Sequence, residues 1–220
     1  RSAIEASGFS FPAKKVVVNL APAETPKVGS SLDLPIALAI LQATGALKNS
    51  LNQYLFVGEL GLTGEIRSTR GAIAFTRLAH TTQQTIVVAK DMARTGQCVP
   101  NTQLVHAQSL QELVSCLNGE REWPPLPPSK LRVTSEPPID LSSVRGQYMT
   151  KRAMEICAAG GHHLLMIGPP GCGKSMLAKS MSGILPPLTD QQALECAQIR
   201  EAGQDVDTVN SHAVPFQAPH

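Results

Sequence analysis

One stretch decides how the C-terminal half of this chain folds: Gly168-Pro169-Pro170-Gly171-Cys172-Gly173-Lys174-Ser175. It fits the pattern G-x-x-x-x-G-K-[ST], whose glycines let the backbone approach an anion and whose exposed amide groups cradle phosphate oxygens. The pattern predicts that Lys174 reaches the β- and γ-phosphates of ATP and that Ser175 offers its hydroxyl to Mg²⁺. The plainer alternative is a glycine-rich turn that only joins two elements.

The residues on either side of this stretch agree with a phosphate-binding loop, or P-loop. Residues 163–167 are an apolar run typical of a buried parallel strand. Residues 176–185 carry apolar side chains at helical spacing, and Pro186-Pro187 ends that predicted helix. Strand, glycine-rich loop and helix, in this order, are the context that a P-loop requires.

The composition is that of an ordinary globular protein. The 220 residues are 42% hydrophobic but only 4% aromatic, so we expect cores built from Val, Ile, Leu and Ala. The formal charge of +2 neither supports nor excludes nucleic acid as a partner. No apolar run approaches the roughly 18 residues of a membrane span, so no membrane partner is expected. Because the chain begins without Met and ends inside an element, we expect it to be a piece of a longer protein.

The five cysteines, at positions 98, 116, 157, 172 and 196, are scattered and form no C-x-x-C pair. This spacing argues against a zinc site and against a dense disulfide framework, and it indicates a reducing, cytoplasmic location. Cys172 occupies a variable position of the P-loop. We interpret it as a small space-filling residue, and a redox-sensitive thiol beside the phosphate-binding amides is the alternative.

The N-terminal half alternates predicted strands with predicted helices, which indicates a compact α/β domain. Helices are expected at residues 1–8, 34–45 with Asp33 as cap, 72–80, and 109–117, where Ser109 and Glu112 match a capping box. Strands are expected at 15–20, 54–57, within 58–66, and at 85–89 and 104–106. Residues 21–31 are expected to form a loop.

Four segments of this half carry a family resemblance: Asn19-Leu20-Ala21-Pro22-Ala23, Pro26-Lys27-Val28-Gly29, Asp33-Leu34-Pro35-Ile36-Ala37-Leu38 and Val57-Gly58-Glu59-Leu60. They resemble the N-terminal domain of the ComM/YifB family, a group of Mg-chelatase-like proteins of the AAA+ class. The resemblance implies a fold similar to the protease domain of Lon, an α/β fold of the ribosomal S5 domain 2-like kind.

Lon proteases use a serine that a lysine activates, and Ser31 falls about where that serine would lie. The lysine should follow Gly71, but residues 72–77 read Ala-Ile-Ala-Phe-Thr-Arg. A serine without an activating base is a poor nucleophile, so we expect no proteolysis. Ser30 and Ser31 are interpreted as turn or capping residues, and the domain as a scaffold for assembly or substrate contact.

The densest charged stretch of this half contains Glu59, Glu65, Arg67 and Arg70. We interpret it as a solvated loop with surface ion pairs, which usually contribute little to stability. A contact with a neighbouring subunit or with nucleic acid is the alternative. His80 and His106 are isolated in the sequence and are interpreted as structural residues rather than ligands.

Six of the 17 prolines lie within residues 123–128 and 136–138. Such segments favour extended polyproline II, so we interpret residues 120–138 as an interdomain linker. Trp123, the only tryptophan, is expected to pack against a domain edge. A proline-rich ligand for another protein's groove is the alternative.

The C-terminal half shares further segments with the same family: Gly146-Gln147, Lys151-Arg152-Ala153, Ala158-Ala159-Gly160-Gly161-His162, the P-loop, Leu185-Pro186-Pro187-Leu188-Thr189 and Pro215-Phe216-Gln217-Ala218-Pro219-His220. Residues 140–147 resemble the segment that lies beside adenine in AAA+ ATPases, and a helix is expected at 151–159. The resemblance implies that Val144 and Gly146 contact the base and that Gly168 through Met176 hold the phosphates.

A last helix is expected to start at Thr189 and to carry Glu195 and Glu201. Either carboxylate is a conceivable catalytic acid. We interpret both as solvated, because neither follows an apolar strand, where the Walker B acid of P-loop ATPases lies. The resemblance implies that the Walker B acids, the sensor residue and the trans-acting arginine lie beyond His220. We therefore assign no catalytic residue here and expect weak nucleotide binding without efficient turnover.

The expected organisation is a Lon-protease-like α/β domain at residues 1–119, the linker at 120–138, and the first part of a P-loop AAA+ α/β domain at 139–220. The resemblance implies a cytoplasmic ATPase that forms a ring, as a hexamer, and acts on DNA in recombination or natural transformation, as a helicase or branch-migration motor. The alternatives are a motor subunit that inserts Mg²⁺ into a porphyrin and a non-enzymatic scaffold that nucleotide only assembles.

Overall fold

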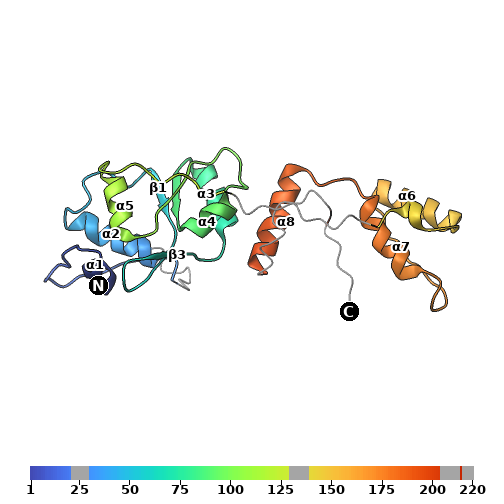
Figure 1. The fold of residues 1–220 in the computed structure, drawn as a ribbon, viewed down its shortest axis with the longest axis horizontal. Helices are drawn as coiled ribbons and strands as arrows, with labels where there is room; N and C mark the ends of the chain where they lie inside the picture. Colours follow the sequence, from blue (N-terminus) through green and yellow to red (C-terminus); the bar gives the residue numbers. More distant parts are fainter. Residues whose placement is uncertain (21–29, 129–138, 204–213, 215–220) are drawn as a thin grey trace. The chain divides into compact units, whose positions relative to one another are not determined.

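The computed structural model describes residues 1–20, 30–128, 139–203 and 214. The chain divides into two compact units, Arg1–Leu131 and Arg132–His220 (Figure 1). Residues 21–29 of the loop predicted at 21–31, the second half of the predicted linker and the terminal segment at 215–220 lie outside the described residues. None of the described helices is both long and apolar enough to cross a bilayer.

A parallel sheet of three strands, in the order β1-β4-β5, forms the centre of the first unit (Figure 1). The strands are β1 (Tyr54–Phe56), β4 (Thr85–Val88) and β5 (Leu104–His106). In the middle strand, Ile86, Val87 and Val88 are each at most 1% exposed. A middle strand of a parallel sheet is covered on both faces, which explains its uninterrupted apolar run. Together with its helices, this sheet confirms the predicted α/β class.

The core of the first unit packs two helices, α2 (Asp33–Ala43) and α5 (Leu110–Leu117), in one cluster with β4. Five of its leucines are at most 1% exposed: Leu34, Leu38 and Leu41 of α2 and Leu110 and Leu113 of α5. Their spacing of three and four residues places them on one face of each helix. The predicted helices at 34–45 and 109–117 are therefore confirmed.

The helix caps agree only in part with the prediction. Ser109 caps α5 as expected, since its hydroxyl accepts the N–H of Glu112 at 3.2 Å. The Glu112 carboxylate does not return to Ser109 but accepts the N–H of Gln108 at 2.8 Å. The prediction that Asp33 caps α2 is wrong: Asp33 is the first helical residue, and the cap position is Leu32, which forms no side-chain bond.

A short antiparallel hairpin of β2 (Glu59–Leu60) and β3 (Ile66–Arg67) follows β1. Gly64 in its turn has a φ of +87°, and a Cβ there would overlap the hydroxyl of Ser7, just after helix α1 (Ser2–Ala6). The Gly64 carbonyl accepts the N–H of Leu110 at 2.8 Å. The glycine is therefore required both by its backbone angle and by the close approach of α1.

One helix precedes β4 in the chain and another follows it. The first, α3 (Ala72–Thr82), was predicted, whereas α4 (Lys90–Gly96), which connects β4 to β5, was missed. Polar residues interrupt the apolar pattern of α4, and its cap residue Ala89 forms no side-chain bond. This helix forms because Met92 and Ala93 are buried where the chain must cross back to a parallel neighbour.

The strand predicted at residues 15–20 is wrong. No described strand pairs with this run, and Val17 is 77% exposed. β-branched residues favour an extended chain, but a strand forms only where a neighbour supplies hydrogen bonds.

The described residues of the second unit form helices and no strand. The helical elements are η1 (Leu141–Ser143), α6 (Tyr148–Gly160), α7 (Lys174–Ser180), η2 (Met181–Gly183) and α8 (Asp190–Ala202). Thr189 caps α8 with a full capping box that includes Gln192, which confirms the helix start predicted there. Glu195 is exposed as predicted, but Glu201 is only 7% exposed, so its interpretation as a solvated residue is wrong.

A small core joins η1, α6 and α7 of the second unit. It consists of Leu141, Val144, Met154 and Leu177, with Leu164 and Met166 packed against it. Leu165 and Ile167, by contrast, are 83% and 89% exposed. The run at 163–167 therefore has one buried and one open face and forms no strand, so the predicted buried strand is wrong for the described residues. An extended run needs a paired neighbour before both its faces are covered.

Candidate nucleotide-binding site

Two glycines give the P-loop its backbone shape. Gly171 and Gly173 have φ values of +81° and +86°, in the left-handed region that residues with a Cβ rarely adopt. Helix α7 begins at Lys174, immediately after Gly173, two residues earlier than predicted. The loop therefore turns sharply into the helix, as the sequence pattern requires.

The amide groups of this turn are without acceptors. In the part of the chain that the structure describes, no hydrogen bond uses the backbone N–H of any residue from 171 to 175. Gly171, Gly173 and Ser175 are exposed, so these donors lie at the surface. Adjacent N–H groups of this kind are the donors that bind an anion in phosphate-binding loops. The backbone therefore fits a phosphate ligand.

The side chain of Lys174 folds back onto the loop. Its Nζ donates to the carbonyl oxygens of Gly168 and Pro169, both at 2.7 Å, and lies 3.5 Å from the Sγ of Cys172. A lysine ammonium has three donors, and these are the acceptors within its reach. To bind a phosphate, Lys174 must exchange two neutral carbonyls for charged oxygens.

Cys172 packs against the first glycine of the loop. A Cβ placed on Gly168 would lie 3.1 Å from the Cys172 Sγ, so the sulfur fills the space that a side chain at 168 would need. This contact supports the interpretation of Cys172 as a space-filling residue. Ser175, the predicted Mg²⁺ ligand, is exposed at the start of α7.

The residues predicted to contact the base lie in the same unit. Val144 is 8% exposed and shares the small core with Leu177 of α7. Gly146 has a φ of +67°, with open space beside its Cα. Asp140 holds η1 in place: its carboxylate accepts the N–H of Ser142 at 2.8 Å, and this bond holds the pKa of Asp140 below its ordinary value. Through Val144 and Leu177, the segment before α6 packs against the helix that follows the P-loop.

The remaining loop residues are exposed. Pro169 and Pro170 lie at the surface, and Met176 on the first turn of α7 is 43% exposed. The structure thus brings Gly168 through Met176 and Val144 around one helix, α7. Whether they bind nucleotide stays a prediction.

The charged stretch of the first unit is a surface ion-pair cluster. Arg67 pairs with Glu65 and, at 3.9 Å, with Glu59, and all three side chains are at least 37% exposed. Hydrogen bonds from Thr63 and then Arg67 lower the pKa of Glu65. No sequence pattern marks the contact of Thr63 with Glu65, because it depends on how the turn between them folds. This geometry agrees with a solvated surface.

Two further residues from the sequence analysis have structural contacts. Ser30 donates its hydroxyl to the carboxylate of Glu59 at 2.6 Å, which links the start of α2 to β2. His106 is 1% exposed and contacts the Pro125 oxygen through Nε2, whereas His80 is exposed. Among the residues that the structure describes, no group of three His, Cys, Asp or Glu side chains is placed to hold a metal ion.

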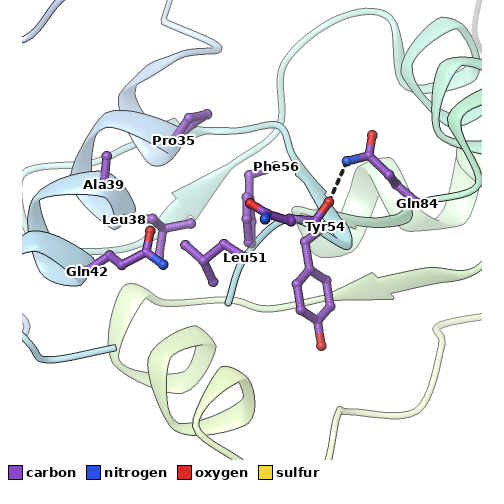
Figure 2. A pocket seen from close by; sticks show the side chains of 9 residues that line it. Pro35, Leu38, Ala39, Gln42, Leu51, Tyr54, Phe56 and Gln84 are labelled. Atoms are coloured by element: carbon purple, nitrogen blue, oxygen red, sulfur yellow. Dashed lines mark hydrogen bonds between the residues drawn. The ribbon is translucent and has the colours of Figure 1, made fainter. Parts of the chain in front are cut away.

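A cavity of about 450 Å³ lies in the first unit between α2 and β1 (Figure 2). It is lined by apolar and amide side chains: Pro35, Leu38, Ala39, Gln42, Leu51, Asn52, Tyr54, Phe56 and Gln84. None of these described lining residues carries a charge, so the cavity offers no counter-charge to a phosphate. The chemistry of the described residues therefore points to the P-loop rather than to this cavity.

Both halves of the chain match known families. A family model described as "Subunit ChlI of Mg-chelatase" matches residues 1–92, and one described as "Magnesium chelatase, subunit ChlI" matches residues 140–220.

The chain is also similar along its whole length to several curated proteins. It is 40% identical over 226 residues to Competence protein ComM of Haemophilus influenzae, covering 100% of this chain and 44% of that protein. It is 42% identical over 228 residues to YifB of Escherichia coli and 45% identical over 224 residues to YifB of Salmonella typhimurium, again covering 100% of this chain and 44% of each relative. The chain thus spans less than half the length of these relatives, and it belongs to the ComM/YifB family of Mg-chelatase-like proteins.

Proposed function

We propose that the P-loop of this chain binds ATP together with Mg²⁺ and that the full-length protein hydrolyses ATP as a motor of the AAA+ class. The observation that carries the proposal is the row of unbonded N–H groups at residues 171–175, in a turn shaped by Gly171 and Gly173. The family match supports it, because the Mg-chelatase family belongs to the AAA+ ATPases.

Each residue of the loop has a distinct part in this proposal. The N–H groups of residues 171–175 donate to phosphate oxygens, and Lys174 gives up its two carbonyl contacts to reach the far phosphates. The Ser175 hydroxyl binds Mg²⁺, which supplies charge neutralisation between the phosphates when it is bound. Val144 and Gly146 contact the base through apolar surface and backbone. No described carboxylate is assigned as the catalytic acid.

The proposed assembly is a cytoplasmic ring, a hexamer, that acts on DNA as a helicase or branch-migration motor. The support for a ring is the AAA+ class of the family. The support for DNA is the name of one relative, Competence protein ComM, since competence is the state in which a cell takes up DNA. A net charge of only +2 offers no electrostatic argument for nucleic acid in this part of the protein.

A second candidate function is that of a metal-chelatase motor subunit. Both family models carry Mg-chelatase descriptions, and one of them covers residues 1–92 of the N-terminal half. The two candidates share the P-loop chemistry and differ in what the motor acts on. A fold shared by both cannot choose between them.

Calorimetric titration of the 220-residue chain with ATP, in the presence and absence of Mg²⁺, tests the nucleotide site. We expect saturable one-site binding that strengthens with Mg²⁺ and that excess inorganic triphosphate displaces. If ATP does not bind at millimolar concentration, or if binding survives the triphosphate, the loop is only a turn between two elements.

The substrate is tested on the full-length protein, with wild-type ATP binding as the precondition. DNA that stimulates ATP hydrolysis, and binds with an affinity that falls steeply with salt, supports the DNA motor. Stimulation by a porphyrin and Mg²⁺ but not by DNA would instead favour the chelatase candidate. ATP binding without any stimulated hydrolysis would favour a nucleotide-assembled scaffold.

A further inference from the structure

The first unit holds a proline-rich segment against its surface. We define the strap as residues 122–128, which belong to the segment interpreted from sequence as a linker. Three of its carbonyl oxygens accept hydrogen bonds from side chains of β5, of α5 and of the residue after α4. The pairs are Cys116 Sγ with the Glu122 oxygen (3.6 Å), His106 Nε2 with the Pro125 oxygen (3.1 Å) and Gln97 Nε2 with the Pro127 oxygen (2.8 Å).

Apolar contacts accompany these hydrogen bonds. Trp123 packs against the core of the first unit, and its ring centroid lies 6.2 Å from that of Tyr54 in β1. The Tyr54 ring points away from the α2 side chains that line the neighbouring cavity (Figure 2), so the ring itself is available to Trp123. Pro127 is buried. One aromatic and one proline thus anchor the two ends of the strap.

The strap has the chemistry of a proline-rich ligand. Proline lacks an N–H, so such a segment forms few hydrogen bonds within itself and presents carbonyl oxygens to outside donors. Grooves that recognise proline-rich segments combine aromatic surface with side-chain donors to these carbonyls. Gln97, His106, Cys116 and Tyr54 provide this combination.

Burial of the His106 ring leaves one of its nitrogens without a hydrogen-bond partner among the described residues, which costs stability. Its side chain is 1% exposed, and among the described residues Nδ1 has no hydrogen-bond partner. Because a carbonyl only accepts, the ring proton must lie on Nε2, facing the Pro125 oxygen. A leucine would fill this core position without an unpaired nitrogen. What the histidine adds is the donor to the strap.

We propose that Tyr54, Gln97, His106 and Cys116 form a groove that recognises proline-rich segments, and that the chain's own residues 122–128 occupy it as a releasable strap. The groove is an intramolecular version of a peptide-binding site, and a preformed extended ligand loses little entropy when it docks. The strap sets where the first unit ends and how much chain is left to join the second. Each residue released from it adds up to about 3.5 Å of reach.

Alkylation of Cys116 in the 220-residue chain measures release of the strap. Burial raises the pKa of the Cys116 thiol, and the strap contacts its sulfur, so this thiol reacts only when the strap opens. Gln97→Ala removes the bond to the Pro127 oxygen together with a bond from the same Nε2 to the Ala93 oxygen of α4 at 3.2 Å, and it changes no fully buried side chain. We expect it to shift the equilibrium between docked and released strap about fivefold towards release. The Cys116 alkylation rate, followed by mass spectrometry, should rise by the same factor. Gln53→Ala, an exposed glutamine of the same unit without a strap contact, is the matched control and leaves the rate unchanged.

Two further variants separate the groove from general loosening of the unit. Pro125 is an exposed residue of the strap, so Pro125→Gly changes no core side chain. It removes the stiffness of the ligand and must therefore also accelerate alkylation. His106→Leu should raise the Cys116 alkylation rate above that of the wild type. His106→Gln keeps a side-chain donor, so its rate should lie between those of His106→Leu and the wild type. Acrylamide quenching of Trp123, the only tryptophan, must increase in the same variants. If Gln97→Ala and Pro125→Gly both leave Cys116 and Trp123 as protected as in the wild type, the strap is a fixed part of the fold and the proposal fails.

Discussion

Replacing Lys174 by alanine is the sharpest perturbation of the proposed nucleotide site, because the structure sets the size of the effect. An ammonium about 4 Å from one phosphate charge, at an effective dielectric constant near 20, is stabilised by about 4 kcal/mol. In the free chain, however, the same ammonium already holds the carbonyl oxygens of Gly168 and Pro169 at 2.7 Å. Since the ammonium is only half-buried, these resting contacts together contribute about 2 kcal/mol.

The difference, about 2 kcal/mol, is what Lys174 adds to ATP binding. The dissociation constant for ATP should therefore be about 30-fold larger in Lys174→Ala than in the wild type. If Lys174 made no contacts in the free chain, the same variant would lose about 1000-fold in affinity for ATP. The assay is calorimetric or fluorescence titration of the 220-residue chain with Mg²⁺ and ATP. Lys179→Ala is the matched control, since Lys179 is an exposed lysine in the last turn of the same helix. We expect its dissociation constant to stay within about twofold, because screening weakens distant charges.

AMP provides the second comparison, because it lacks the phosphates that Lys174 reaches. The loss of affinity caused by Lys174→Ala should therefore be close to zero when AMP replaces ATP. Equal ATP binding by Lys174→Ala and the wild type, or an equal loss in Lys179→Ala, would refute the reasoning. A loss that is the same for AMP as for ATP would place the lysine near the base rather than the phosphates.

Three further predictions concern the loop, the core and the ion-pair cluster. Gly173→Ala puts a Cβ on a φ of +86°, which costs about 1–2 kcal/mol, so the free variant loop should relax to another angle and recover this cost only on binding. ATP binding should therefore weaken about tenfold, whereas Gly119→Ala, at φ +75° in the first unit, should leave ATP binding unchanged. Leu110→Ala empties a position that is fully buried and should lower the free energy of unfolding by about 2–5 kcal/mol in urea titrations, whereas Leu62→Ala, at a side chain 76% exposed, should change it by less than about 0.5 kcal/mol. Thr63→Val removes the largest cause of the lowered pKa of Glu65, so carboxyl NMR titration should show that pKa rising towards its ordinary value, and an unchanged pKa would mean that the contact is absent in solution. Because the folded-state pKa is the lower one, any stability that this carboxylate contributes is present above the ordinary glutamate pKa and is lost as the pH falls through the folded value.

Several elements were predictable from the sequence because their signals are local. Ser109 and Thr189 mark the starts of α5 and α8 through bonds to residues three positions ahead, which any chain with this spacing can form. The leucines of α2 share one face because of helix periodicity alone. Gly171 and Gly173 adopt left-handed angles because glycine lacks a Cβ, whatever surrounds them. The P-loop backbone was therefore predictable, and so was its place before a helix.

Contacts between distant residues were not predictable, because no local pattern encodes them. Residues 15–20 and 163–167 have strand-forming composition, but pairing requires a neighbouring strand, and the described residues place none beside them. Helix α4 has a weak local pattern and exists because β4 and β5 are parallel. The ammonium of Lys174 turns back because two carbonyls are the acceptors in reach. The strap is held by donors from the residue after α4, from β5 and from α5, which only the fold brings together. Hydrogen bonds between distant residues form only after the chain between them has been ordered.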